Sequence, residues 1–454
     1  MSLAKPVLKI KLGYLPLAKA SWLDDRVETA RQQAESFLRG FDVELISSGK
    51  TVVADDEARD CAARFAAQQV DVLLVHFITF SLGSIIPILI SRMRAPMILW
   101  GVPEPVMDGG RLKANSFCAL NMNCHTLWKM ERPCAHLFGS EADIRKPLQS
   151  QLAAIACMKN LRESRLGLVG NRVPGFYASN FNELALRSQF GVEVKHIDLA
   201  ELFEVAGRQL TACPSDLAME VKACAGAVKG PTDQELGKAG ALYRGLIAIA
   251  QKRELDGFAV KCWPEFGDFF GVAVCATLGM LNDAGFPTAC EGDVYGAVSM
   301  LMAAHLAGSA PFFMDMVAAN PADNTCVFWH CGAVPASLCR QPGCGVLRHH
   351  GIMDGGDRKG VTNDFPVKEG PVTILRLGEG RHGHRLLIAS GEGLPTDCII
   401  RGNPLRVKMK CPVDDFTRVI LDQGFEHHYT LVHGWIGDEA QNLCKWLDIE
   451  SVIP

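Results

Sequence analysis

The chain has 454 residues, 48% of them hydrophobic, and a formal net charge of −4. That length is enough for two or three domains, each with its own apolar core. The small negative charge, with both signs mixed along the sequence, argues against a protein that binds nucleic acid or an acidic membrane surface. Composition therefore favours a globular protein of two or three domains.

Seventeen cysteines are scattered along the chain. Several of them, such as Cys157, Cys275 and Cys326, stand in apolar runs, where a thiol serves as a small hydrophobic group. The sequence does not open on a signal peptide. We therefore expect reduced cysteines and a cytoplasmic protein.

The first 105 residues alternate between strand-like and helix-like segments. Apolar strands are expected at 7–17, 42–47, 70–77 and 95–104, and amphipathic helices at 24–41 and 55–69. The run 70–90 has the length of a membrane span but contains Asp71, His76 and Pro87, so a buried strand followed by a short core helix explains it better. This alternation predicts a parallel sheet covered by helices on both faces, in an N-terminal domain of residues 1–160.

The same alternation restarts after a helical connection near residues 141–163. The expected strands are 164–171, 192–199, 256–263 and 287–293, and the expected helices are 179–190, 232–255, 267–285 and 294–308. This predicts a second doubly wound domain over residues 161–335. Residues 340–412 are rich in Gly and Pro with short alternating runs. They predict a small antiparallel, barrel-like domain over residues 336–454, closed by a helix at 438–449. The fold class is therefore α/β with a β-rich C-terminal domain.

Acidic side chains follow two strands of the predicted second sheet. Glu265 comes just after the strand ending at Trp263, and both Glu291 and Asp293 follow the next one. In open α/β sheets, ligands bind outside the carboxyl ends of the strands, and the spacing between Glu265 and Asp293 suits one strand–helix–strand crossover. Paired carboxylates with a nearby imidazole suit Mn²⁺ or Mg²⁺. The alternative is structural, with Asp293 acting as the N-cap of the helix that follows.

Histidines supply the possible imidazole. His427 and His428 are adjacent in an extended segment, so at most one of them is expected to face a given site. His330 ends another apolar strand. The remaining pairs, His349 with His350 and His382 with His384, stand in polar, loop-like surroundings. The sequence contains neither a GxxxxGK[ST] phosphate loop nor a GxSxG nucleophile motif nor paired CxxC zinc ligands.

Three segments resemble the L-fucose isomerase and L-arabinose isomerase superfamily. They are "CEGDVYGAVSMLMAAHLAGSAPFFMDM" (290–316), "GPVTILRLGEG" (370–380) and "EHHYTLVHG" (426–434). Their order and domain context carry the resemblance over most of the chain, although the N-terminal half shows little that matches. Members of this superfamily interconvert aldoses and ketoses with a divalent metal, usually Mn²⁺, held by two carboxylates and a histidine. Their subunits cooperate at the active site, which implies a homo-oligomer, either a trimer or a hexamer.

Carried onto this sequence, the resemblance makes Glu265, Asp293 and His428 the metal ligands, with either carboxylate able to act as the catalytic base. It places His330 and His427 near the substrate. Trp263 is expected either to line the sugar pocket or to pack in the core. The predicted function is a metal-dependent aldose–ketose isomerase that acts on an open-chain sugar through an ene-diolate. The alternatives are an epimerase or lyase on a sugar derivative, and a non-catalytic sugar-binding protein.

Overall fold

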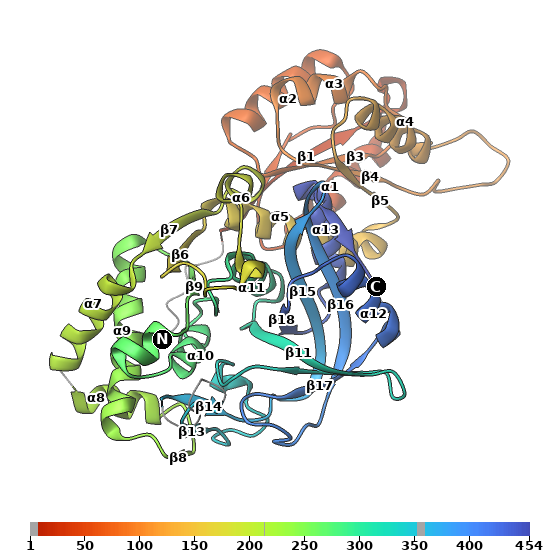
Figure 1. Cartoon of the computed structure of the whole chain (residues 1–454). Coiled ribbons are helices and arrows are strands. Elements are labelled where there is room, and N and C mark those ends of the chain that lie inside the picture. Colours follow the sequence, from red (N-terminus) through yellow and green to blue (C-terminus); the bar gives the residue numbers. More distant parts are fainter. Residues whose placement is uncertain (1–7, 213, 352–358) are drawn as a thin grey trace. The chain divides into compact units, whose positions relative to one another are not determined.

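A computed structural model describes residues 8–212, 214–351 and 359–454, and the described chain divides into two compact units. Residues 8–159 and 445–448 form one unit, and residues 160–444 and 449–454 form the other. Figure 1 shows the elements of each unit coloured along the sequence. Each unit is described by itself below.

The N-terminal unit is built on a five-stranded parallel sheet with the order β2-β1-β3-β4-β5, a common doubly wound order. The strands are β1 (Ile10–Leu17), β2 (Val43–Ser47), β3 (Val72–Phe77), β4 (Met97–Gly101) and β5 (Cys134–Phe138). The helices are α1 (Asp25–Leu38), α2 (Asp55–Ala67), α3 (Ile85–Arg92), α4 (Ser116–Lys129) and α5 (Glu141–Glu163), the last of which leads into the second unit.

The apolar run 70–90 forms β3 and the short helix α3, as the sequence predicts. All six side chains of β3 are buried because the strand lies inside the sheet, between β1 and β4. Among the described residues, no helix combines the length and the apolar character needed to cross a membrane.

The second unit contains a four-stranded parallel sheet with the order β10-β9-β6-β7. Its strands are β6 (Arg165–Val169), β7 (Glu193–Ile197), β9 (Gly257–Val260) and β10 (Thr288–Ala289). The associated helices are α6 (Glu183–Phe190), α7 (Leu199–Ala212), α8 (Pro214–Lys222), α9 (Asp233–Arg253), α10 (Cys275–Asp283) and α11 (Val294–Ala307). Helix α9 begins with a capping box, in which Thr232 and Glu235 each bind the other's backbone N–H.

A closed six-stranded antiparallel barrel follows. Its strands pair in the order β15-β18-β11-β12-β17-β16, and pairing of β15 with β16 closes the ring. They are β11 (Phe312–Asn320), β12 (Thr325–Trp329), β15 (Gly370–Gly380), β16 (Gly383–Leu394), β17 (Leu405–Met409) and β18 (His428–His433). The remaining elements are α12 (Val413–Asp422), α13 (Gly437–Leu447) and β19 (Glu450–Val452), which pairs with β16. The predicted fold class is confirmed.

Two strands of the barrel, β11 and β12, come from the sequence before residue 336. A small sheet also joins the two parts, since β13 (Val346–Arg348) pairs with β8 (Ala227–Lys229) on one side and with β14 (Thr362–Asp364) on the other. The central sheet and the barrel thus belong to one compact unit. The boundaries at residues 160 and 335 remain predictions.

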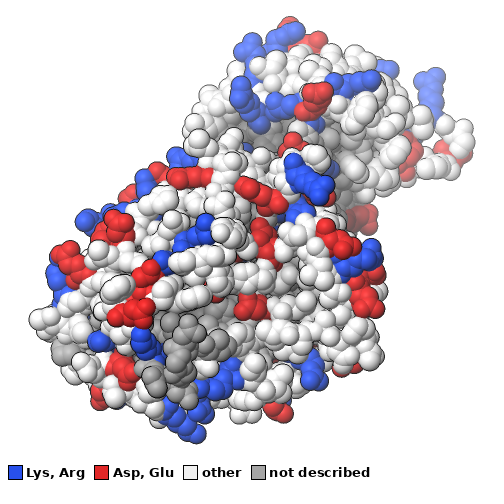
Figure 2. All heavy atoms as spheres, viewed as in Figure 1, with Lys and Arg blue, Asp and Glu red and all other residues white. Residues whose placement is uncertain are grey.

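One expectation about the cysteines is wrong. Cys339 and Cys344 form a disulfide, so the fully reduced state does not hold for this pair. The two residues lie five positions apart, on either side of a short turn, where backbone proximity brings the thiols together. On the face seen in Figure 2, basic and acidic side chains are interspersed, in line with the mixed charge of the sequence.

Candidate active site

The carboxyl ends of β9 and β10 present the acidic residues expected from the sequence. Gly292, in the turn after β10, has a positive φ of 70°, and a Cβ there would lie 2.2 Å from the carbonyl oxygen of Asn171. Only glycine fits such a close approach, which packs this turn against the loop that follows β6. Asp293 comes next and caps α11, because its Oδ1 accepts a 2.8 Å hydrogen bond from the backbone N–H of Gly296. The N-cap role proposed as the structural alternative is therefore present.

Asp293 also has two charged or ionisable partners in the barrel. Its Oδ2 accepts a 2.6 Å hydrogen bond from Nη1 of Arg376 on β15 and lies 3.0 Å from Nδ1 of His428 on β18. Arg376 and Asp293 are 0% and 1% exposed. Burial alone would raise the pKa of Asp293, but the charge of Arg376 and the hydrogen bond from His428 hold the pKa well below its usual range. Asp293 is therefore a buried, permanently ionised carboxylate.

This contact also fixes the chemistry of His428. An ionised carboxylate only accepts hydrogen bonds, so Nδ1 of His428 carries the proton that it donates to Asp293. The other ring nitrogen, Nε2, then faces Oε2 of Glu291 at 3.4 Å and Oδ1 of Asp315 at 3.6 Å. A histidine oriented by a carboxylate in this way, with its second nitrogen turned toward acidic oxygens, is a typical metal ligand.

Glu291 is the acid that contacts both of the paired histidines. Its Oε2 lies 3.2 Å from Nε2 of His427, and the two histidine rings lie 3.9 Å apart. Burial would raise the pKa of Glu291, but the hydrogen bond from His427 and the charge of His428 outweigh it and lower the pKa. Both members of the histidine pair thus face one carboxylate. The prediction that only one would do so, drawn from strand alternation, does not hold because His427 precedes the first residue of β18.

His330 comes directly after β12, and its ring centroid lies 6.5 Å from that of His428. Its Nε2 is 3.0 Å from the thiol of Cys290, which in turn is 3.7 Å from Nε2 of His428. His330 and Cys290 are both buried. His330 is therefore a neighbour of His428, as the resemblance implies, and the two are linked through a cysteine.

Glu265 occupies a separate position after β9. One carboxylate oxygen is bound by Nζ of Lys261, and the other, Oε2, is buried without a hydrogen-bond partner. Within the described residues, three sets of His, Cys or carboxylate ligand atoms lie within 4.8 Å of one another, and neither Glu265 nor Asp293 belongs to them. The sets are Glu291, His427 and His428; Cys290, His330 and His428; and Cys275, Cys331 and His350. The structure thus places Asp293 in contact with His428, whereas Glu265 belongs to none of the three ligand sets.

Aromatic rings line the same region. The ring of Phe176, in the loop after β6, lies 5.6 Å from Trp263 and 5.8 Å from His427, with an edge-to-face arrangement in both cases. Trp263 is partly exposed rather than a core residue. The rings of Trp263, Phe176 and His427 thus form a row that ends at Glu291.

Glu291 was expected with Glu265 and Asp293 as an acid at a strand end, although it was given no ligand role of its own. Three other contributors were not predicted from the sequence: Cys290, Asp315 and Arg376. Arg376 had a weak signal, because it is the only charged residue in the apolar run "VTILRLG" of β15. Cys290 and Asp315 had no such signal. A cysteine in an apolar run is typical of a protein core, and Asp315 is typical of the polar face of a strand.

The chemistry of these donors fits a divalent cation. Carboxylate oxygens and an imidazole nitrogen are ligands that Mn²⁺ and Mg²⁺ accept. The buried oxygens Glu265 Oε2 and Asp315 Oδ1 have no hydrogen-bond partner, which is costly unless a cation or a ligand satisfies them. The metal-ligand assignment of Glu265, Asp293 and His428 stays a prediction.

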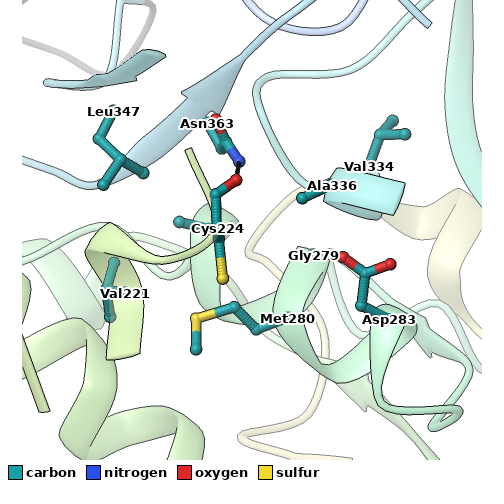
Figure 3. A pocket seen from close by; sticks show the side chains of 10 residues that line it. Val221, Cys224, Gly279, Met280, Asp283, Val334, Ala336, Leu347 and Asn363 are labelled. Atoms are coloured by element: carbon teal, nitrogen blue, oxygen red, sulfur yellow. Dashed lines mark hydrogen bonds between the residues drawn. The ribbon is translucent and has the colours of Figure 1, made fainter. Parts of the chain in front are cut away.

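A small pocket elsewhere in this unit is separate from these side chains (Figure 3). Asn363 and Cys224 both line it, and Asn363 donates a 3.0 Å hydrogen bond to the carbonyl oxygen of Cys224. Its lining is mostly apolar and includes Val221, Ala276, Met280, Val334 and Leu347. The acids and histidines described above are absent from this lining, so the pocket carries no argument about their chemistry.

Comparison with known proteins decides the family. Residues 13–162 match the family model described as "Fucose/sulfoquinovose isomerase, N-terminal domain". A sulfoquinovose isomerase from Alkalicoccus urumqiensis is 32% identical over 97% of this chain and 98% of that protein. The chain belongs to the fucose/sulfoquinovose isomerase family. It is therefore an isomerase, and the superfamily resemblance read from the sequence is confirmed.

Other members of the family match over a similar length. A sulfoquinovose isomerase from Priestia aryabhattai is 30% identical over 97% of this chain and 98% of its own, and one from Clostridium sp. (strain MSTE9) is 28% identical over 98% and 99%. The family model matches residues within the N-terminal half, where the sequence motifs show little resemblance to the superfamily.

Proposed function

We propose that this isomerase interconverts an aldose and a ketose by moving a proton between C1 and C2 of an open-chain sugar, through an ene-diolate and with a bound divalent cation. The observation that carries the proposal is full-length similarity to sulfoquinovose isomerases, combined with the buried carboxylate–imidazole cluster at the carboxyl ends of β9 and β10. The names of these relatives favour a sulfonated hexose as the substrate class.

We infer that Glu265, Asp293 and His428 hold the cation, with Mn²⁺ as the first choice and Mg²⁺ as the second. Contact between Asp293 and His428 and the unpartnered oxygen of Glu265 support this set. Glu291 is an additional donor, since its Oε2 faces Nε2 of His428. When bound, the cation supplies Lewis-acid polarisation of the sugar's carbonyl and hydroxyl oxygens.

Of the two carboxylates, Glu265 is the better base. Asp293 shares its Oδ2 with Arg376 and His428, and these partners favour the charged form so strongly that the carboxylate accepts a proton poorly. Glu265 has one oxygen bound by Lys261 and one without a partner, so that oxygen is available to take the proton from carbon and return it to the neighbouring carbon. Asp293 would then act as a cation ligand that also orients His428, and not as the base.

The remaining predicted residues would contact the sugar. The rings of Trp263 and His427, together with Phe176, offer an apolar surface for the C–H face of a sugar. His330 is buried beside Cys290, so it would reach the sugar only at the inner end of such a site. We further propose a cytoplasmic homo-oligomer, a trimer or a hexamer, which sedimentation equilibrium would test.

The deciding experiment is turnover of a panel of sugars with added Mn²⁺ and after treatment with a chelator. The panel contains sulfoquinovose, glucose 6-phosphate, L-fucose and L-arabinose, and NMR in D₂O identifies the product and any deuterium incorporated at C1 of a ketose or at C2 of the recovered aldose. We expect a ketose product from the sulfonated sugar, deuterium incorporation and loss of activity on chelation. An epimeric aldose or a cleaved product would instead indicate the epimerase or lyase reaction.

Variants assign the roles. Glu265→Gln is expected to lower kcat by about 10²–10⁴-fold while Mn²⁺ still binds at reduced affinity. Asp293→Asn is expected to weaken Mn²⁺ binding, and Glu204→Gln, an exposed acid on α7, serves as the matched control with unchanged turnover. If Glu291→Gln abolishes Mn²⁺ binding and Glu265→Gln leaves both binding and turnover intact, the ligand set is Glu291, His427 and His428 instead.

A further inference from the structure

A second cluster of metal-binding side chains lies apart from the carboxylates. The ligand atoms of Cys275, Cys331 and His350 all lie within 4.8 Å of one another, and the two thiol sulfurs are 3.5 Å apart. Cys275 and His350 are 5% and 7% exposed, so the cluster is nearly enclosed. None of these residues is used in the proposed isomerase chemistry.

Three separate elements bring the cluster together. Cys275 begins α10, Cys331 follows β12, and His350 follows β13. Because these positions are far apart in sequence, their side chains meet only through the tertiary fold.

Backbone contacts around β14 hold each ligand in place. On α10, the N–H of Ala276 donates to Val361 at 2.9 Å, and the carbonyl of Gly332, next to Cys331, accepts from Asn363 at 3.3 Å. A Cβ at Gly332 would lie 2.6 Å from that of Thr362, so the Cys331 loop is packed tightly on the strand. The N–H of His350 donates to Lys359 at 3.3 Å. The donor atoms are thus positioned by the fold before any ligand binds.

The spacing of the sulfurs suits a tetrahedral thiolate site. Two thiolates bound to Zn²⁺ at about 2.3 Å stand about 3.8 Å apart at the tetrahedral angle, close to the observed 3.5 Å. A disulfide would require about 2.05 Å between the sulfurs. Two sulfur donors and one imidazole favour a soft cation over Mn²⁺ or Mg²⁺, which prefer oxygen.

We propose that Cys275, Cys331 and His350 form a second metal site, which binds Zn²⁺ through two thiolates and one imidazole and leaves a fourth position to a water molecule. On binding, each thiol gives its proton to solvent. The site ties the start of α10 to the end of β12 and to the β13–β14 sheet. It also borders the candidate active site, because Sγ of Cys331 lies 3.5 Å from Nδ1 of His330.

The test is replacement of Zn²⁺ by Co²⁺ in the full chain, followed by absorption spectroscopy, with reductant present throughout. Thiolate ligands give a near-ultraviolet sulfur-to-cobalt charge-transfer band that carboxylates and histidines do not. We expect this band in the wild-type protein, together with about one equivalent of Zn²⁺ in the protein as isolated by elemental analysis. Cys275→Ser and Cys331→Ser should each weaken the band and lose the Zn²⁺.

Two controls make the result specific. Cys398→Ser removes an exposed thiol and should leave the band unchanged. Cys290→Ser removes the thiol of the other mixed cluster, with His330 and His428, and should also leave it unchanged. A band lost in Cys290→Ser but kept in Cys275→Ser would overturn the proposal, as would a wild-type protein with neither band nor Zn²⁺. A Cys275–Cys331 disulfide found by mass spectrometry in the protein as isolated would do the same. The outcome is independent of isomerase activity.

Discussion

The buried ion pair between Arg376 and Asp293 makes a quantitative prediction. Arg376 is fully buried and donates to Asp293 at 2.6 Å, and its Nε also lies 3.3 Å from Oε2 of Glu426. Replacing it in Arg376→Met keeps much of the side-chain volume but removes the positive charge. Asp293 would then keep only the hydrogen bonds from His428 and Gly296, so its charge would be buried with too little compensation.

Breaking a buried pair in this way costs about 3–5 kcal/mol. The unit that contains the pair has about 300 residues, for which the entropy of unfolding is about 0.6 kcal/mol/K. The cost therefore corresponds to a fall in Tm of about 5–8 °C for that unit, measured by differential scanning calorimetry in the presence of a chelator. Arg208→Met, which breaks an exposed pair with Glu204 on α7, is the matched control and should lower Tm by less than about 1 °C.

A double-mutant cycle tests the cause. In Arg376→Met/Asp293→Asn neither partner is charged, so the double variant should be less destabilised than the sum of the two single variants by about 1–3 kcal/mol. Additive effects, with no coupling between the two positions, would refute the reasoning that an uncompensated Asp293 charge causes the loss. A Tm change for Arg376→Met no larger than that of Arg208→Met would refute it as well.

Three further predictions concern stability. Gly292→Ala should lower the free energy of unfolding far more than Gly308→Ala, for which about 1 kcal/mol is expected. Both glycines have positive φ, but only a methyl group at Gly292 would meet the carbonyl oxygen of Asn171. Differential scanning calorimetry of the two variants measures the difference. Burial lowers the pKa of His76 to about 3, so the folded form resists protonation and stability falls as pH drops below 6.5, by about 2 kcal/mol at pH 5. His76→Gln should remove that pH dependence, and an unchanged slope would contradict it. Thr232→Ala should cost about 1 kcal/mol through loss of the α9 cap, with Thr232→Ser near wild type in urea unfolding.

Much of the fold follows from local patterns in the sequence. Continuous apolar strands alternating with amphipathic helices can be buried only in a parallel sheet with helices on both faces, and both such sheets are present. The same rule places Glu265 and Asp293 at the carboxyl ends of β9 and β10, because each follows a strand in a repeating strand–helix unit. The helix cap at Asp293 is equally local, since it involves a residue only three positions away.

The partners of these acids were decided by tertiary structure. Arg376 and His428 reach Asp293 from β15 and β18, more than 80 residues along the chain, because the barrel closes through pairing of β15 with β16 and of β15 with β18. No local pattern encodes such a pairing: it depends on the whole set of strands finding a closed arrangement that leaves no unpaired edge. The sequence by itself therefore determined which acids stand at the sheet edge, while only the closed barrel decided which charges they meet, since Coulomb partners in a buried site are set by distance in space rather than along the chain.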